Sequence, residues 1–202
     1  MIHSFPSRSW LRNQSFFAYA LLAFFSTSCS NSLFKVKPLS ELPPLSTAAA
    51  SANIGVVTFR AAPLLTDEQT QELFEANLQL AGLLPIRLEV IHNGGDAVEI
   101  KKLKFRLHDG SNAEWKLISA RAAISRIIKA NGVFAYNPNS RKTFAKEFRA
   151  YEFDLKAPLT HAEGKRHGIL IFQTAKKDPV ASPRELTLTI EGLAQPVSLK
   201  LN

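Results

Sequence analysis

The 202-residue chain contains a single cysteine, Cys29, so no disulfide can form within it. Small secreted scaffolds usually need disulfides, whereas a periplasmic domain does not. The composition is otherwise that of a globular protein, with 46% hydrophobic and 21% charged residues, which argues against wholesale disorder. The length is sufficient for one domain with a hydrophobic core.

The sequence also lacks the short motifs of common enzymes. It contains no glycine-rich phosphate loop, no His-Glu-x-x-His or Cys-x-x-Cys metal motif and no Gly-x-Ser-x-Gly nucleophile elbow. Eight acidic residues are numerous enough for paired acid–base chemistry, but each has a lysine or arginine nearby in the sequence, which favours ion pairs on the surface. These residues are Glu89, Asp96, Glu99, Asp109, Glu147, Glu152, Asp154 and Glu163. We therefore expect no enzymatic activity and no cofactor.

Four histidines follow the N-terminal region: His92, His108, His161 and His167. A zinc site needs three or four converging ligands. His161 and His167 flank a short loop that also holds Glu163, which makes these three residues the best metal candidate. Histidines at turns and on the surface account for the pattern more simply, and we predict no metal site.

The N-terminal region has too short an apolar run for a membrane-spanning helix. Phe16 to Phe25 is apolar over ten residues, whereas a spanning helix needs about 20. Before this run lie Arg8 and Arg12 and no acid, and after it come small hydroxyl residues. This layout is typical of a secretory signal peptide. A short uncleaved anchor is the alternative.

The position of Cys29 refines this prediction. Cys29 follows Thr27 and Ser28 directly after the apolar run, and the segment resembles a bacterial lipoprotein signal peptide. Ser26 departs from that pattern, in which an aliphatic residue is usual. The resemblance implies that residues 1–28 are removed and that Cys29 is diacylated on sulfur and becomes the mature N-terminus. Ser30 then implies an outer-membrane anchor with the domain facing the periplasm. Ordinary secretion with an unused thiol is the alternative.

Residues 29–53 are predicted to be a lipid-attached, proline-rich tether. Pro38, Pro43 and Pro44 favour extended, semi-rigid chain that builds no core. Such a spacer would hold the domain clear of the lipid. The alternative is that the apolar side chains of the segment dock on the domain or a partner; these are Leu33, Phe34, Val36, Leu39, Leu42 and Leu45.

Residues 54–202 are predicted to form the folded domain. The pattern predicts a helix over 66–82, which Thr66 and Gln69 cap. Two further helices are predicted over 119–132, with Ser119 as a possible cap, and over 137–151, with Asn137 and Pro138 at the start. Strands are predicted by alternating apolar residues bounded by turn signals. They are 54–61, 86–91, 98–107, 115–117, 168–174, 185–191 and 196–202. Turns are predicted at 93–96 and 109–112, and a bulge or short break is predicted between Ile100 and Leu103.

The strand and turn sequences HNGGD (92–96), FRLHDGS (105–111) and HGILIFQT (167–174) resemble the immunoglobulin-like sandwiches of bacterial lipoproteins and late-embryogenesis-type domains. This resemblance implies a mainly β fold, an antiparallel immunoglobulin-like sandwich with two or three short helices, and an exported binding or stress-related module. Seven short strands also favour a sandwich over a barrel.

The formal net charge is +8, and basic residues decorate the two central helices. They are Arg121, Arg126, Lys129, Arg141, Lys142, Lys146 and Arg149, and the segment 101–106 (KKLKFR) adds four more. Such surfaces bind phosphate-rich polymers or anionic lipid headgroups. Export conflicts with nucleic-acid binding, which leaves anionic lipid, lipopolysaccharide or an acidic envelope protein. The simpler account is a solvated basic face over an aromatic core.

The sequence thus predicts a lipid-anchored protein of the cell envelope that acts as a non-enzymatic binding or envelope-assembly module. One alternative is an enzyme acting on envelope polymers. Another is a structural subunit of an envelope secretion complex.

Overall fold

A computed structural model describes residues 32–202, which form one compact unit; the predicted signal peptide and Cys29 lie outside the described residues. The strands are β1 (Ala50–Ile54), β2 (Val57–Pro63), β3 (Leu83–His92), β4 (Lys104–His108), β5 (Glu114–Ile118), β6 (Lys165–Gln173), β7 (Thr187–Glu191) and β8 (Val197–Lys200). The helices are α2 (Asp67–Phe74), α3 (Ala120–Ala130) and α4 (Pro138–Arg149), with the short 3-10 turns η2 (Leu39–Glu41) and η3 (Ile100–Lys102).

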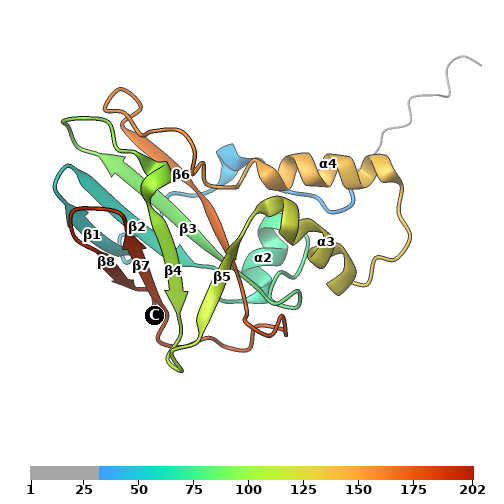
Figure 1. Cartoon of the computed structure of the whole chain (residues 1–202). Helices are drawn as coiled ribbons and strands as arrows, with labels where there is room; N and C mark the ends of the chain where they lie inside the picture. Colours follow the sequence, from blue (N-terminus) through green and yellow to red (C-terminus); the bar gives the residue numbers. More distant parts are fainter. Residues whose placement is uncertain (1–31) are drawn as a thin grey trace, which may run out of the picture. The chain divides into compact units, whose positions relative to one another are not determined.

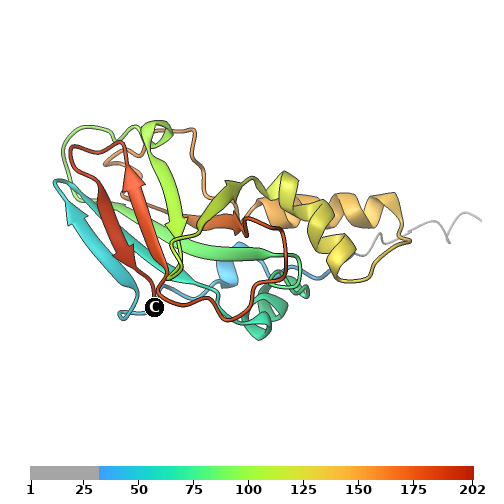
Figure 2. The same cartoon turned by 60° about the horizontal axis from the view of Figure 1, so that its bottom comes forward.

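The eight strands form one antiparallel sheet in the order β1-β2-β3-β6-β5-β4-β7-β8. The two edge strands, β1 and β8, lie next to each other, so the sheet is nearly closed (Figures 1 and 2). The three helices gather at one end of this sheet. The mainly β, antiparallel prediction with two or three short helices is confirmed. The predicted two-sheet sandwich is wrong, because a single barrel-like sheet replaces it.

Strand β6 explains why the sheet is continuous. Its side chains alternate between two hydrophobic cores: Leu170 and Phe172 face the interior of the sheet, while Ile169 and Ile171 pack with the helices. Because both faces are buried, the strand reads as an unbroken apolar run. It pairs with β3 on one side and β5 on the other, and so joins the two halves that a sandwich would separate.

The first helix begins as predicted but ends early. Thr66 and Gln69 form the reciprocal capping box, whereas the helix stops at Glu75, whose φ is 51°. Beyond it, the Leu78 N–H donates to Thr70 Oγ1 at 3.3 Å, and the Asn77 N–H donates to Asn131 Oδ1 at 2.9 Å. These side-chain acceptors replace the helical carbonyls, so residues 76–82 form turns instead of a further helical segment.

The N-terminal part of the described chain packs against the domain. Phe34, Val36 and Leu45 are all buried, and β1 pairs with β2 where the predicted spacer ends. Arg60 Nη2 donates to the carbonyl of Ser46 at 2.8 Å and fixes the segment on the outer face of β2. The predicted tether is therefore wrong for residues 32–53, and the docking alternative describes them. The folded part of the described chain therefore includes residues 32–53 as well as 54–202.

The single strand expected at 54–61 is in fact a hairpin. Gly55, with a φ of 55°, lies in the turn between β1 and β2. The predicted break between Ile100 and Leu103 is present as η3, and the predicted turns at 93–96 and 109–112 separate strands as expected. The domain is thus built as a series of antiparallel strands with the α3–α4 pair inserted between β5 and β6.

Candidate functional site

The central insertion is a pair of packed helices, α3 and α4, referred to here with their flanking caps as the α3–α4 hairpin (residues 119–151). Ser119 caps α3 by accepting from the Ala122 N–H, and Asn137 caps α4 just before Pro138. Both caps were predicted. The buried stripe of each helix packs into the second core, where Phe144 and Phe148 lie with rings 5.6 Å apart. The aromatic stripe is therefore core, as the simpler account predicted.

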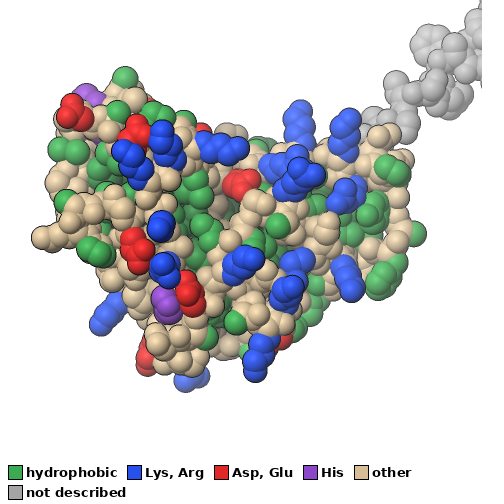
Figure 3. All heavy atoms as spheres, viewed as in Figure 1, with side chains coloured by type: hydrophobic (Ala, Val, Ile, Leu, Met, Phe, Trp, Pro, Cys, Tyr) green, Lys and Arg blue, Asp and Glu red, His purple; other side chains and the backbone are tan. Residues whose placement is uncertain are grey.

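The opposite faces of the two helices carry the predicted basic residues. Figure 3 shows lysine and arginine side chains gathered over α3 and α4. Five of the seven predicted residues are exposed and form no ion pair within residues 32–202. They are Arg121, Lys129, Lys142, Lys146 and Arg149. These five side chains are the available cations of the surface.

The other two predicted residues have structural roles. Arg126 is half-buried and donates to the carbonyls of Ala81 at 2.7 Å and Lys177 at 3.0 Å. Arg141 donates to Ser125 Oγ at 3.2 Å and so links the two helices. Arg126 in particular holds α3 against the turn before β3, and its guanidinium is engaged within the protein.

The distribution of charge singles out the α3–α4 hairpin. Its 33 residues contain seven basic side chains and one acidic side chain, Glu147. The rest of residues 32–202 contains sixteen basic and sixteen acidic side chains. All of the net positive charge of the described protein therefore lies in the α3–α4 hairpin, and the other elements are balanced. Such a local excess creates a positive potential that attracts anions.

The segment 101–106 does not extend this surface. Its residues lie on η3 and β4, and two of its cations pair with acids of neighbouring elements. Lys101 Nζ is 3.1 Å from a Glu99 oxygen, and Arg106 lies 3.3 Å from Glu114 and 3.2 Å from Glu191. Its other two lysines, Lys102 and Lys104, are exposed and form no ion pair within residues 32–202, but they lie on η3 and β4 and not on the helices.

The loop between α3 and α4 contains two aromatic residues that sequence reasoning missed. Phe134 is 84% exposed and Tyr136 is 40% exposed, and they are two of the four large apolar side chains exposed in the described chain. The loop forms the end of the hairpin farthest from the sheet (Figure 2). Two aromatics in a short loop between basic helices were the available signal, since nothing in the loop offers them a core.

The start of the described chain lies against the same helices. The Leu33 N–H donates to the carbonyl of Ser140, in the first turn of α4, at 3.2 Å. Phe34 packs edge-to-face on Phe144 with ring centroids 5.1 Å apart. Residue 32 is therefore held within about one helical turn of the aromatic loop.

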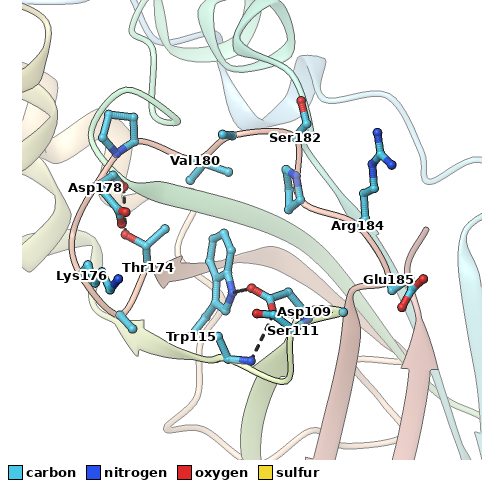
Figure 4. A pocket seen from close by; sticks show the side chains of 16 residues that line it. Asp109, Ser111, Trp115, Thr174, Lys176, Asp178, Val180, Ser182, Arg184 and Glu185 are labelled. Atoms are coloured by element: carbon cyan, nitrogen blue, oxygen red, sulfur yellow. Dashed lines mark hydrogen bonds between the residues drawn. The ribbon is translucent and has the colours of Figure 1, made fainter.

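A second feature is an open hollow of about 670 Å³ beneath the segment 174–185. Figure 4 shows the Trp115 ring standing in it beside the Asp109 carboxylate. Asp109 accepts from Trp115 Nε1 at 2.9 Å, from the backbone and hydroxyl of Ser111, and from the Ala113 N–H. Partial burial acts to raise the pKa of Asp109, but these hydrogen bonds outweigh it, and the pKa is lowered. The carboxylate is thus committed to holding its own turn.

His161 lies in a turn, whereas His92, His108 and His167 lie on β3, β4 and β6, and His92 is buried. The best metal candidate, His161 with Glu163 and His167, does not assemble: within residues 32–202 no three His, Cys, Asp or Glu side chains are close enough to hold a metal ion. His161 instead lies 5.8 Å from the ring of buried His92. His92 accepts from the Gly94 N–H at Nδ1 and donates from Nε2 to the carbonyl of Asp96. These two hydrogen bonds hold the turn that follows β3.

Comparisons with protein-family models, curated proteins and solved structures give no match. Among residues 32–202, no helix has the length and apolar character required to cross a membrane.

Proposed function

We propose that this chain is an exported lipoprotein of the cell envelope, anchored to the outer membrane through a lipid on Cys29, whose domain faces the periplasm. The folded unit serves as a non-enzymatic binding or envelope-assembly module. Support for export comes from Arg8 and Arg12, the ten-residue apolar run and the small residues before Cys29. A single acyl chain binds membranes only marginally, so the two or three chains of a lipoprotein suit a permanent anchor.

One structural observation carries the proposal. Leu33 and Phe34, four and five residues after the single cysteine, already pack on the α3–α4 hairpin, the most positively charged element of the described chain. A lipid on Cys29 therefore has no long spacer, and the anchor would keep the domain at the membrane surface. Placing the available cations next to the anchor favours a ligand that carries negative charge at that surface.

The five available cations define the ligand class. Exposed arginine and lysine side chains without acidic partners bind phosphate groups by charge-assisted hydrogen bonds. Within an envelope, phosphate-bearing ligands are anionic lipid and lipopolysaccharide, and an acidic protein face offers carboxylates instead. The surface is formed by the exposed faces of two helices, which suits recognition of a headgroup layer better than enclosure of one small molecule.

The test is the mass of the mature N-terminus after expression of the full chain in a Gram-negative host, with Cys29→Ala as control. The proposal expects a fragment that begins at Cys29 and carries diacylglycerol, and membrane association that Cys29→Ala abolishes. An unmodified N-terminus, or cleavage at another residue, would overturn the lipoprotein assignment and leave Cys29 without a role.

A further inference from the structure

The tip of the α3–α4 hairpin combines exposed aromatic groups with unpaired cations. Phe134 is 84% exposed, although phenylalanine is among the residues most often buried in proteins. Lys129 ends α3 before the loop, and Lys142 lies in the first turns of α4 after it. Along the chain, the exposed Phe134 thus lies between two exposed lysines.

This combination matches the physical demands of a membrane interface. An aromatic side chain gains by leaving water for the boundary between headgroups and acyl chains, and basic side chains gain by approaching anionic headgroups. Tyr136, 40% exposed, has an apolar ring and a polar hydroxyl, which suits the same boundary.

The chain itself indicates which surface the tip meets. Leu33 is hydrogen-bonded to Ser140 near the loop, and the four residues from Leu33 back to Cys29 span at most about 14 Å. A lipid on Cys29 would therefore be attached within about 14 Å of Leu33, which lies against the first turn of α4. No comparable constraint points to the far end of the sheet, where β1 and β2 turn at Gly55.

We infer that the tip of the α3–α4 hairpin is a second membrane contact, which inserts Phe134 and Tyr136 into the interface of an anionic lipid leaflet while Lys129 and Lys142 bind the lipid phosphates. This contact fixes the orientation of the domain, with the helices toward the lipid and the open turns of the sheet away from it. The orientation rests on the proposed lipid anchor, but the affinity of the tip for anionic lipid does not.

The experiment measures co-sedimentation of residues 32–202, a unit with its own two hydrophobic cores, with vesicles. Phosphatidylcholine alone is compared with phosphatidylcholine containing about 30 mol% phosphatidylglycerol. Binding is expected only to the anionic vesicles, and it should fall when salt is raised from about 0.05 M to about 0.5 M. Phe134→Ser, and separately Lys129→Glu with Lys142→Glu, should each weaken binding about tenfold or more.

Two matched controls keep the test specific. Val56→Ser removes an exposed apolar side chain from the β1–β2 turn, and Lys101→Glu with Lys102→Glu reverses two exposed charges on η3. Both should bind anionic vesicles as the unchanged protein does. Circular dichroism and thermal melts of every variant establish that the fold is intact, which the high exposure of the substituted side chains predicts.

Three outcomes would overturn the inference: no binding to anionic vesicles, equal binding to neutral vesicles, or equal losses in the control variants. An acidic protein as the true partner would give the first of these. The result is separable from the anchor, because vesicle binding without a lipidated Cys29 would retain the contact and remove the proposed function. A lipidated Cys29 without vesicle binding would do the reverse.

Discussion

Tyr151, just beyond α4, donates a hydrogen bond from its phenolic oxygen to the carbonyl of Lys37 at 2.6 Å, across 114 residues of sequence. Its ring packs edge-to-face on Phe74 of α2 with centroids 5.0 Å apart. One side chain therefore joins the N-terminal segment, α2 and the end of α4. Burial, with a smaller contribution from Glu41, raises the pKa of Tyr151 above its usual value of 10.0.

Tyr151→Phe should lower the free energy of unfolding by about 1–2 kcal/mol, because it leaves the Lys37 carbonyl without its donor. The raised pKa sets a pH dependence as well. The phenol contributes its full stability below the unfolded-state pKa, and this contribution is lost as pH rises through the higher folded-state pKa. Urea denaturation between neutral pH and about pH 11 should show this loss in the unchanged protein and not in Tyr151→Phe. Equal pH profiles would contradict the role given to the hydroxyl.

Phe34→Ala should destabilise the domain by about 2–4 kcal/mol, because it leaves a cavity beside Phe144 and removes the edge-to-face contact. Lys35→Ala is the matched control, since the Lys35 side chain is exposed and the hydrogen bond to Glu75 comes from its backbone. A free tether would give no change for either substitution. Urea denaturation of both variants distinguishes a docked segment from a spacer.

The features that were predicted from sequence are those determined by near neighbours. The Thr66–Gln69 capping box, the Ser119 cap and the Asn137-Pro138 helix start each depend on residues within one helical turn. The turns at 93–96 and 109–112 likewise depend on residues that tolerate positive φ. Such signals survive folding because the local hydrogen bonds they describe are made in any tertiary context.

The features that were missed depend on distant partners. Arg60 holds the carbonyls of Leu45 and Ser46, and Asn131 accepts from Asn77, 54 residues away. Nothing in the proline-rich segment itself indicates that the Arg60 guanidinium on β2 binds its carbonyls, so the segment alone predicts an extended spacer. The single sheet could not be predicted for a similar reason, because the pattern of residues along β6 does not indicate which strands pair with it.

The candidate surface was predicted in part. The sequence shows which residues are charged, and five of the seven predicted cations are exposed. Arg126 instead binds the carbonyls of Ala81 and Lys177, and the sequence does not indicate this because both partners are distant along the chain. Phe134 and Tyr136 were passed over because exposure is a property of the folded chain. Whether an aromatic side chain in a loop is buried or exposed depends on which other elements pack against the loop, and the sequence does not show this.

Gly168→Ala should destabilise the domain by more than about 2 kcal/mol. A Cβ at this position on β6 would lie 2.6 Å from Phe153 Cα and 2.9 Å from its backbone nitrogen, so backbone atoms have to move. Gly110→Ala is the matched control, because the closest atom to the added methyl would be a Glu185 carboxylate oxygen at 2.9 Å, the far end of a flexible side chain, and Glu185 Cβ at 3.2 Å has to shift by only a few tenths of an ångström. Thermal melts should show a large loss for Gly168→Ala and a loss below about 1 kcal/mol for Gly110→Ala. Similar losses would contradict the close approach of β6 to the chain after α4.

Asp109→Asn should lower the free energy of unfolding at pH 7 by about 1–2 kcal/mol, because an amide satisfies only part of the donor set that surrounds the carboxylate. The lowered pKa fixes the sign of the pH effect. The ionised carboxylate contributes stability above its unfolded-state pKa, and this contribution is lost as pH falls below the usual value of 3.8 and through the folded-state pKa. Asp109→Asn removes that titration, so urea denaturation from neutral pH to about pH 2.5 should give a flatter profile than the unchanged protein.

Asp178→Asn, at an exposed aspartate of the same hollow, controls for the loss of one negative charge and should leave stability at pH 7 within about 0.5 kcal/mol. If Asp109→Asn were as stable as the unchanged protein at pH 7, the hydrogen bonds of the Asp109 carboxylate would not be needed to hold its turn. The Asp109 carboxylate would then be available to a ligand, and the hollow beside Trp115 would be a candidate binding site.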